Sequence, residues 1–521
     1  MGRGDLLLDG MKRLLWCICV GLMVLSWLPS KARAGTCEDL AKLRISNTYI
    51  HKADVVTHNA FRQVLNHEPI GELPVFCRVV ATLRPSADSN IGVELWLPQR
   101  GWNGRLLGTG SGGFGGFIFY EELAAGLRKG YAVVNADMGL SVPPEKDQAV
   151  FANRPDRWVD WAYRSTHVMT IFAKRIISVY YGRGASHSYF LGCSTGGGQA
   201  LAEAQRYPED YDGLIGGAPP NNRTGVHLSI LWNFISTHRS AGAYIPPAKA
   251  LLLEKAVVAK CDGLDGVRDG IIADPRRCHF NPATLQCTGS DATSCLTAEQ
   301  VKTAQLLYSG PKNPRTGQPL YPGVTLGSEG DWIISFGRPN DVQPPFAPIF
   351  EWVFGTQWSW RTFDFDKQAT EFVRELGTRV NSIDPNLDRL ADLGHKLLIY
   401  HGWGDALVMP GASVDYWNAV AARTHQTPDS YYRLFMVPGM YHCSDGPGAD
   451  NFDPLSAMVD WVEHEVAPDQ IIATKYAQSG AVRFQRLLCP YPQIATYRGH
   501  GDINQAASYR CVQPKAQKGQ K

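Results

Sequence analysis

The sequence predicts an α/β fold in which helices cover a largely parallel β-sheet. Two observations lead to this prediction. Short apolar runs alternate with helical patterns between residues 93 and 217, which is the order of a parallel, helix-covered sheet. In addition, the turn at residues 192–196 has the spacing G-x-S-x-G between a strand-like and a helix-like run. An apolar content of 44% over 521 residues is sufficient for a sizeable core.

The elements follow from their periodicity. Residues 131–136 are apolar throughout, which indicates a central strand. A long helix is expected at residues 157–181, because Trp161, Val168, Phe172 and Ile176 fall on one face. A shorter helix is expected at residues 199–207. Strands are expected at residues 93–97, 104–107, 131–136, 187–191, 211–217, 396–400 and 431–437.

The turn at Ser194 is typical of a nucleophile elbow, since a strand precedes it and a helix follows it. Ser194 must adopt a strained backbone conformation that lifts its hydroxyl clear of the sheet. Side chains at Gly192 or Gly196 would collide with the neighbouring strand and helix. The pattern therefore predicts an α/β-hydrolase fold with Ser194 as nucleophile, against the alternative of a glycine-rich turn that contains a serine by chance.

A nucleophilic serine needs a base, and the base needs a carboxylate that orients it. In this fold the chain order is serine, acid, histidine, with the acid and the histidine in loops after late strands. Asp405 follows the strand at 396–400, and His442 follows the strand at 431–437. Both are the expected members of a triad. The weaker alternatives are Asp415 in a helix, His401 at a strand end and His167 in the middle of a helix.

The glycine run at residues 108–116 has two interpretations. It resembles a dinucleotide fingerprint, and Asp137 lies at the distance expected of a ribose-binding acid, which leaves a dinucleotide-dependent oxidoreductase as the alternative function. However, the run continues into residues 114–117 instead of opening a helix, so the helix N-terminus that would bind pyrophosphate is missing. We favour an oxyanion loop, in which the N–H groups of Gly113 (or Gly112) and Thr195 hold the developing negative charge.

The N-terminus has the pattern of a secretory signal peptide. Lys12 and Arg13 precede an apolar run at residues 14–28, and an A-x-A site ends at Ala34. The run is short for a membrane span, so cleavage after Ala34 is expected, with an uncleaved anchor as the alternative. Translation could also begin at Met11. The formal net charge of +2 argues against a nucleic-acid or anionic-membrane partner.

The strand–helix rhythm stops after residue 221 and resumes near residue 386, which predicts a lid inserted into the core. The expected division is a signal peptide (1–34), a first core part (35–221), a lid domain (222–385) and a second core part (386–521). The polar tail at 515–521 is expected to be disordered. Aromatic side chains of the lid could pack against the flat ring of an aromatic substrate, although such residues fill lid cores more often than they line pockets. The aromatic residues are Trp332, Phe336, Phe346, Phe350, Trp352, Phe354, Trp358 and Trp360.

Three carboxylates lie close together in the lid sequence. Asp262, Asp265 and Asp269 stand in a loop punctuated by glycines. Such a loop suits a hard cation that prefers oxygen, such as Ca²⁺, with backbone carbonyls completing the shell. The spacing is not that of an EF-hand, and an acidic solvated loop is the alternative.

Ten cysteines remain once the signal peptide is removed. An even number in an exported protein indicates five disulfides. The pairing is open at this point, although the local pairs Cys261/Cys278 and Cys287/Cys295 are the easiest to close.

Four segments together resemble the tannase/feruloyl esterase family, which also contains the hydrolase of mono(2-hydroxyethyl) terephthalate. They are residues 192–197 (Gly-Cys-Ser-Thr-Gly-Gly), 401–405 (His-Gly-Trp-Gly-Asp), 438–443 (Pro-Gly-Met-Tyr-His-Cys) and the three-aspartate loop. The specific mark is a cysteine directly before the serine and another directly after the histidine. One residue departs from the pattern: Gly198 stands where a larger polar side chain is expected.

The resemblance implies an α/β-hydrolase core and a lid that carries structural Ca²⁺. It makes Ser194 the nucleophile, His442 the base and Asp405 its orienter. It also implies Ca²⁺ ligation by side-chain oxygens of Asp262, Asp265 and Asp269 and by the carbonyls of Val267 and Ile271. The implied disulfides are Cys37–Cys77, Cys193–Cys443, Cys261–Cys278, Cys287–Cys295 and Cys489–Cys511.

These observations predict a secreted or periplasmic serine esterase that acts through an acyl-enzyme. The expected substrate is a small ester of an aromatic acid, of the feruloyl, galloyl or terephthalate monoester type. A catalytically silent hydrolase-fold binding protein is the second alternative, and the complete Ser/Asp/His set argues against it.

Overall fold

The computed structural model describes residues 35–514 except 64–66, 141–150, 152–153 and 424–425. The predicted signal peptide, both candidate start positions and the predicted disordered tail lie outside the described residues. Within the described ranges, none of the helices combines the length and the apolar composition needed to cross a bilayer.

The core is a mixed β-sheet. Within the described residues, nine strands lie in the order β1-β2-β3-β5-β4-β6-β7-β8-β9. The first three strands and β5 pair in antiparallel fashion, and the strands from β5 through β4 to β9 are parallel. The bounds are β1 Thr48–Val56, β2 Phe76–Leu83, β3 Ile91–Pro98, β4 Arg105–Thr109, β5 Ala132–Ala136, β6 His187–Cys193, β7 Gly213–Gly217, β8 Lys396–Gly402 and β9 Tyr432–Val437.

The strands that the sequence predicts are all present. Strand β5, predicted to be central, is buried along its whole length and lies between β3 and β4. Strands β1 and β2 were not predicted. Only Ala53 of β1 is buried, because β1 is the edge strand of the sheet.

Helices pack on both faces of the sheet. On one face α5 (Ser165–Tyr181), α6 (Thr195–Arg206) and α15 (Gly411–Arg423) share a core with the strands. On the other face lie α3 (Tyr120–Arg128) and α16 (Pro454–His464). The long helix predicted at 157–181 is α4 (Pro155–Val159), a π-helical turn at Asp160–Arg164 and then α5. Trp161, Phe172 and Ile176 are buried on it, as predicted, and Val168 is partly buried. This two-sided cover is that of an α/β-hydrolase.

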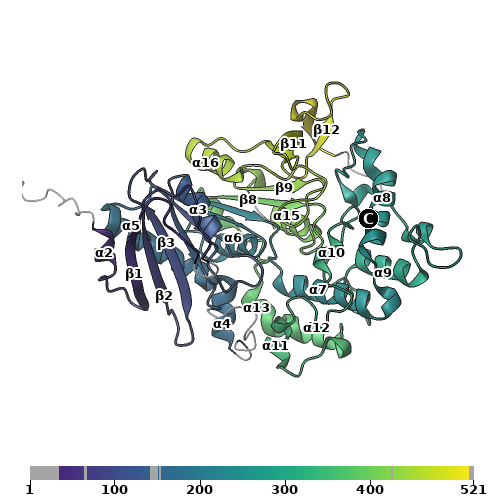
Figure 1. Cartoon of the computed structure of the whole chain (residues 1–521), viewed down its shortest axis with the longest axis horizontal. Coiled ribbons are helices and arrows are strands. Elements are labelled where there is room, and N and C mark those ends of the chain that lie inside the picture. The colour runs from purple at the N-terminus through teal and green to yellow at the C-terminus, as the bar shows by residue number, and fades with distance from the viewer. Residues whose placement is uncertain (1–34, 64–66, 141–150, 152–153, 424–425, 515–521) are drawn as a thin grey trace, which may run out of the picture.

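The chain between β7 and β8 forms helices that lie on the opposite side of the molecule from β1 and β2 (Figure 1). The described residues of this segment contribute no strand to the main sheet. The boundaries predicted at 222 and 385 lie at the N-cap of the first of these helices and just before the last; the division into domains stays a prediction. The helices are α7 Arg223–His238, α8 Pro247–Cys261, α9 Ala298–Ser309, α10 Trp332–Ser335, α11 Pro348–Phe354, α12 Lys367–Phe372, α13 Thr378–Val380 and α14 Asp388–Asp392.

The C-terminal region adds two hairpins that the sequence did not predict: β10 (Ile471–Tyr476) with β11 (Val482–Leu488), and β12 (Ile494–Tyr497) with β13 (Tyr509–Val512). In the described part of the chain, five disulfides form, and they are the five pairs that the family resemblance implies: Cys37–Cys77, Cys193–Cys443, Cys261–Cys278, Cys287–Cys295 and Cys489–Cys511.

Candidate active site

Ser194 lies at the sharp turn between β6 and α6. Its backbone has φ 57° and ψ −124°, a conformation that residues other than glycine rarely adopt. The Ser194 N–H donates to the carbonyl of Gly217 at 2.9 Å, which anchors the turn to the neighbouring strand β7. The strained conformation predicted for the elbow is therefore present.

Close backbone packing explains the glycines around the elbow. A Cβ added at Gly192 would lie 2.7 Å from the Cα of Gly196, and one added at Gly196 would lie 2.9 Å from the Cα of Gly110. Distances below 3.0 Å require the backbone to shift. Gly192 thus allows the helix to cross the strand, and Gly196 allows the loop after β4 to rest on the helix.

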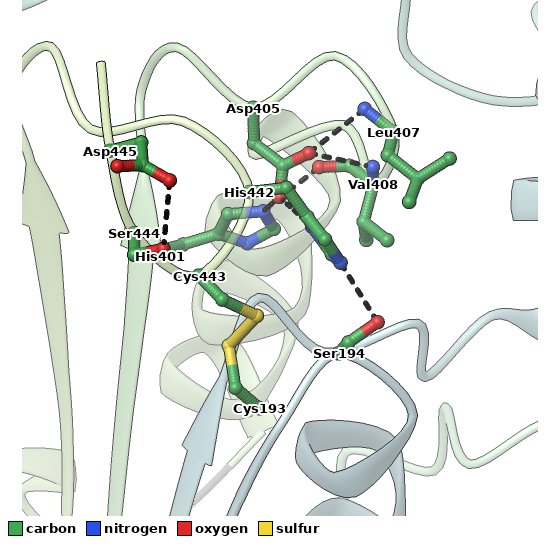
Figure 2. Close-up of a disulfide and its surroundings, with 10 residues drawn as sticks. All are labelled: Cys193, Ser194, His401, Asp405, Leu407, Val408, His442, Cys443, Ser444 and Asp445. Carbon is green, nitrogen blue, oxygen red and sulfur yellow. Dashed lines mark hydrogen bonds and ion pairs between the residues drawn. A yellow bond between two sulfur atoms is a disulfide. The ribbon is translucent and has the colours of Figure 1, made fainter. Parts of the chain in front are cut away.

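Ser194, His442 and Asp405 form one chain of hydrogen bonds (Figure 2). The Ser194 Oγ lies 2.8 Å from His442 Nε2, and His442 Nδ1 lies 2.7 Å from Asp405 Oδ2. Because a carboxylate can only accept, His442 donates from Nδ1, and its Nε2 is left to accept the serine proton. Three residues from separate loops are thus arranged for transfer of a proton from the serine hydroxyl to the imidazole.

Asp405 is fully buried and held by several donors. Its Oδ1 accepts from the N–H groups of Leu407 and Val408, each at 2.9 Å. His401 Nε2 lies 3.1 Å from Asp405 Oδ2 and 2.9 Å from the carbonyl of Val408. Burial alone would raise the pKa of Asp405, but His442 and His401 outweigh it and hold that pKa well below its ordinary value. His401, which the sequence offers only as a weak candidate base, contacts the acid instead of the serine.

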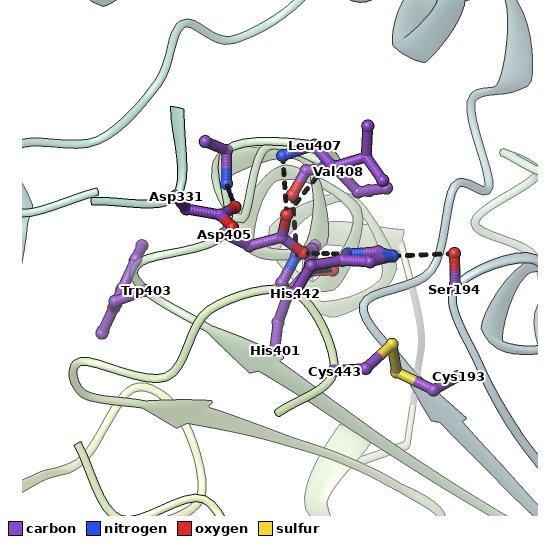
Figure 3. A network of polar contacts seen from close by, with 12 residues as sticks. Cys193, Ser194, Asp331, His401, Trp403, Asp405, Leu407, Val408, His442 and Cys443 are labelled. Atoms are coloured by element: carbon purple, nitrogen blue, oxygen red, sulfur yellow. Dashed lines mark hydrogen bonds and ion pairs between the residues drawn. A yellow bond between two sulfur atoms is a disulfide. The ribbon is translucent and has the colours of Figure 1, made fainter. Parts of the chain in front are cut away.

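A second carboxylate, Asp331, lies beside this network (Figure 3). It is buried, and its Oδ2 accepts from the N–H of Ala406 at 2.9 Å, next to Asp405. Burial raises the pKa of Asp331 to about 6. Burial lowers the pKa of His442, but the charge of Asp405, the hydrogen bond to Asp405 and the charge of Asp331 outweigh it and raise that pKa above its ordinary value. The sequence did not identify Asp331, because it lies more than 70 residues before Asp405.

The disulfide Cys193–Cys443 joins the residue before the serine to the residue after the histidine (Figure 2). The two Cα atoms lie 6.0 Å apart although the cysteines are 250 residues apart in sequence. Cys443 has φ 65°, so the histidine loop turns sharply at this residue. The bond ties the elbow at the end of β6 to the loop after β9.

The glycine-rich loop after β4 rests on the N-terminus of α6. Ser111 N–H donates to Gln199 Oε1 at 2.8 Å. Gly196 N–H donates to the Ser111 carbonyl at 2.7 Å, and Thr195 Oγ1 donates to the Gly113 carbonyl at 2.5 Å. These bonds bring Gly113 and Thr195, the two residues predicted to supply oxyanion donors, next to each other.

The same loop does not have the geometry of a dinucleotide site. The next helix, α3, begins only at Tyr120, so residues 108–116 do not open a helix. Asp137 Oδ1 accepts from the N–H groups of Gly92 and Gly139, at 2.9 and 2.8 Å. The acid that could have bound a ribose therefore stabilises the backbone after β5, and the oxidoreductase alternative is not favoured.

Ser194 and His442 open into a cavity of about 230 Å³. Both predicted oxyanion residues, Gly113 and Thr195, line it, which favours Gly113 over Gly112. Of the eight lid aromatics, Phe346 lines this cavity, whereas Trp332, Phe350, Trp352 and Trp360 are packed in the hydrophobic cores of the lid. The lining residues are Gly113, Phe114, Trp161, Ser194, Thr195, Pro220, Arg223, Val226, His227, Ile230, Phe346, Leu407, Val408, His442 and Cys443.

The acidic loop has carboxylates folded back onto its own backbone. Oδ1 of Asp262 accepts from the N–H of Asp269 at 3.1 Å, and Oδ1 of Asp265 accepts from that of Val267 at 3.0 Å. Burial and the neighbouring carboxylates raise the pKa of Asp265 to about 6. Arg486, which the sequence did not associate with this loop, donates to Asp269 Oδ2 at 2.5 Å. With Arg268, which is in the loop itself, two guanidinium groups stand against three carboxylates, so the loop keeps a net negative charge and hard oxygen donors of the kind that a divalent cation prefers.

The remaining sequence candidates lie elsewhere. Asp415 is in α15, as predicted. His167 lies within α5, its Nδ1 is 2.6 Å from Asp210 Oδ2, and its ring stacks on Tyr207. With the fully buried Glu203, His167 and Asp210 have side-chain atoms within 4.8 Å of one another. This cluster lies outside the cavity that contains Ser194.

Comparison with known proteins gives consistent matches along the chain. The family described as "Tannase and feruloyl esterase" matches residues 77–338 and 355–512. An uncharacterized esterase of Xanthomonas campestris is 34% identical over 93% of this chain and 92% of its own length. A probable feruloyl esterase B-1 of Aspergillus terreus is 34% identical over 84% of this chain and 86% of its own. The crystal structure of feruloyl esterase B from Aspergillus oryzae superposes with a TM-score of 0.84 at 29% identity, covering 91% of this chain and 99% of that one.

Proposed function

The chain belongs to the tannase and feruloyl esterase family and is a carboxylic ester hydrolase, and from this premise we propose that it cleaves esters of aromatic carboxylic acids with Ser194 as the nucleophile. One observation carries the proposal: the hydrogen-bonded chain Ser194–His442–Asp405 opens into a cavity of about 230 Å³. The cavity wall is rich in apolar side chains, including Phe114, Val226, Ile230, Phe346 and Leu407, which suit a flat aromatic acid.

The reaction follows from the geometry of the triad. Ser194 Oγ attacks the ester carbonyl carbon while His442 Nε2 takes the hydroxyl proton, and Asp405 stabilises the imidazolium that results. The N–H groups of Gly113 and Thr195 stabilise the tetrahedral oxyanion. His442 then gives the proton to the leaving alkoxide, and the alcohol departs. Water then attacks the acyl carbonyl while His442 takes its proton; the bond from the carbonyl carbon to Ser194 Oγ breaks, His442 returns the proton to Oγ, and the acid departs.

Turnover of Ser194→Ala tests the proposal. With methyl ferulate, methyl gallate and monomethyl terephthalate as substrates, we expect kcat to fall by several orders of magnitude while the melting temperature stays unchanged. Ser186→Ala is a matched control, because Ser186 is an exposed serine just before the same strand. Near-wild-type turnover of Ser194→Ala would refute the mechanism. The relative kcat/KM values of the three wild-type reactions identify the preferred acid.

We further propose that the acidic loop binds Ca²⁺ as a structural ion. Carboxyl oxygens of Asp262, Asp265 and Asp269 and the carbonyls of Val267 and Ile271 would hold it, supported by the excess negative charge of the loop. The bound ion would supply positive charge that offsets the repulsion between the carboxylates. The loop is not part of the cavity lined by Ser194, so the ion takes no part in the chemistry.

Secretion is proposed on two observations. The N-terminal sequence has the pattern of a cleavable signal, and five disulfides form in the described part of the chain. Disulfides persist in oxidising compartments such as the periplasm and the extracellular space. Cell fractionation, with N-terminal sequencing of the mature protein, tests this: a new N-terminus after Ala34 is expected, and an intact leader would contradict it.

A further inference from the structure

Arg223, the first residue of α7, is a buried cation in the wall of the active-site cavity. Its side chain is 4% exposed, and among the described residues no carboxylate forms an ion pair with it. Burial lowers the pKa of Arg223 to about 9. A buried charge without a counter-charge is costly, so it needs a specific set of partners to persist.

In the described structure, the guanidinium of Arg223 donates hydrogen bonds to one residue, Thr195. Nη1 donates to Thr195 Oγ1 at 3.2 Å, and Nη2 lies 3.5 Å from the Thr195 carbonyl. The guanidinium also lies over the ring of Trp161, with 4.4 Å between its Cζ and the ring centroid, an arrangement that favours a cation. Arg223 is therefore held against the residue that directly follows the nucleophile.

Thr195 connects Arg223 to the glycine-rich loop through its hydroxyl. Its hydroxyl accepts from Arg223 and donates to the Gly113 carbonyl at 2.5 Å. A hydroxyl that accepts from a cation becomes a stronger donor, because hydrogen bonds in a chain polarise one another. The series Arg223–Thr195–Gly113 thus links the two residues whose N–H groups serve as oxyanion donors in the proposed mechanism.

Gly198 lies beside this arrangement. A Cβ added at Gly198 would lie 3.4 Å from Arg223 Nη2 and 3.5 Å from the ring of Pro220. The space beside the first turn of α6, where the sequence pattern leads one to expect a larger polar side chain, is therefore next to a guanidinium that comes from α7.

We propose that Arg223 is a positioning residue for the oxyanion hole: it holds the Thr195 hydroxyl on the Gly113 carbonyl and so fixes the distance between the two amide donors. The inference rests on the proposed function of Ser194. Catalysis is sensitive to this distance, since the donors must lie at hydrogen-bond range from the oxyanion and not from the ground-state carbonyl. Loss of Arg223 should then lower kcat and leave KM nearly unchanged.

The test compares kcat and KM of Arg223→Gln and Arg223→Lys with the wild type, on neutral methyl ferulate and anionic monomethyl terephthalate. We expect Arg223→Gln to lower kcat about 10- to 100-fold on both esters, with KM within about twofold. Arg223→Lys should retain more activity, because an ammonium can still donate to Thr195. Arg206→Gln is the matched control: this arginine is on α6, lies over Tyr163 and is absent from the cavity wall.

Two further variants separate positioning from other roles. Thr195→Val removes the hydroxyl. The double variant Thr195→Val/Arg223→Gln should lower kcat little more than either single change does, since both changes break the same series of contacts. Gly198→Arg in the Arg223→Ala background returns a guanidinium from α6 and should restore part of kcat. Melting temperatures of all variants show which are folded; if Arg223→Gln does not fold, Arg223→Lys and the rescue variant decide.

Each contrary result has a distinct meaning. A loss confined to the anionic ester, or to KM, would make Arg223 a substrate contact and overturn the inference. Wild-type kcat in Arg223→Gln, with Ser194→Ala inactive, would overturn the inference alone. Wild-type turnover by Ser194→Ala would refute the proposed function and the role of Arg223 with it.

Discussion

Removal of the Cys193–Cys443 bond should affect both stability and turnover. The bond closes a segment of 250 residues, and the chain-entropy treatment gives about 5.5 kcal/mol for a loop of that size as an upper value. The bond also limits how far Ser194 can move from His442. Ser194 Oγ and His442 Nε2 lie 2.8 Å apart. A displacement of about 1 Å at such a contact can cost on the order of a hundredfold in rate.

The double variant Cys193→Ala/Cys443→Ala tests this, with kcat and KM measured well below its melting temperature. We expect a lower melting temperature and a kcat reduced by tens- to a hundredfold. The matched control is Cys37→Ala/Cys77→Ala, because that pair has a similar Cα separation, 5.6 Å against 6.0 Å, and lies outside the cavity wall. The control should lose stability and keep its kcat. Equal kcat in both double variants would show that the Cys193–Cys443 bond acts only on stability.

Three other outcomes are expected. The kcat/KM of the wild type should fall as the pH drops through the raised pKa of His442, because the base must be neutral. Asp331→Asn should shift this acid limb to lower pH, because it removes a negative charge that raises the pKa of His442; an unchanged limb would contradict the role given to Asp331. Treatment with a calcium chelator should lower the melting temperature, as should Asp262→Ala in the presence of Ca²⁺; a metal-free protein with an unchanged melting temperature would count against the ion.

The nucleophile turn could be predicted because its signal is local. A strand, a serine with a glycine two residues to either side, and a helix follow one another within about twenty residues. The close contact of Gly192 with Gly196 is local as well, whereas that of Gly196 with Gly110 depends on the fold. Asp405 and His442 could be placed because the fold requires an acid and a histidine after late strands. The five disulfide pairs came from the family resemblance and not from geometry.

The parts that the sequence missed depend on contacts between distant segments. Arg223 looks like an ordinary helix-starting residue, and only the fold places its guanidinium against Thr195. Asp331, the N-cap residue of α10 in the inserted segment, contacts the acid loop from a distant part of the chain. The sequence offers His401 only as a weak candidate base for the serine, whereas its side chain contacts the acid Asp405. Hydrophobic periodicity does not report such pairings, because it describes which face is buried and not what lies across it.

The distance along the chain between the two halves of the site has a consequence for biosynthesis. His442 follows Ser194 by 248 residues, so a ribosome adding roughly 5–20 residues per second completes the serine some 12–50 s before the histidine. Throughout that interval the nascent chain carries a nucleophile without its base and cannot hydrolyse esters. Cys193 also waits for its partner while Cys261, Cys278, Cys287 and Cys295 are made. An early bond between Cys193 and one of these four thiols would have to be broken by thiol–disulfide exchange before the Cys193–Cys443 bond could form.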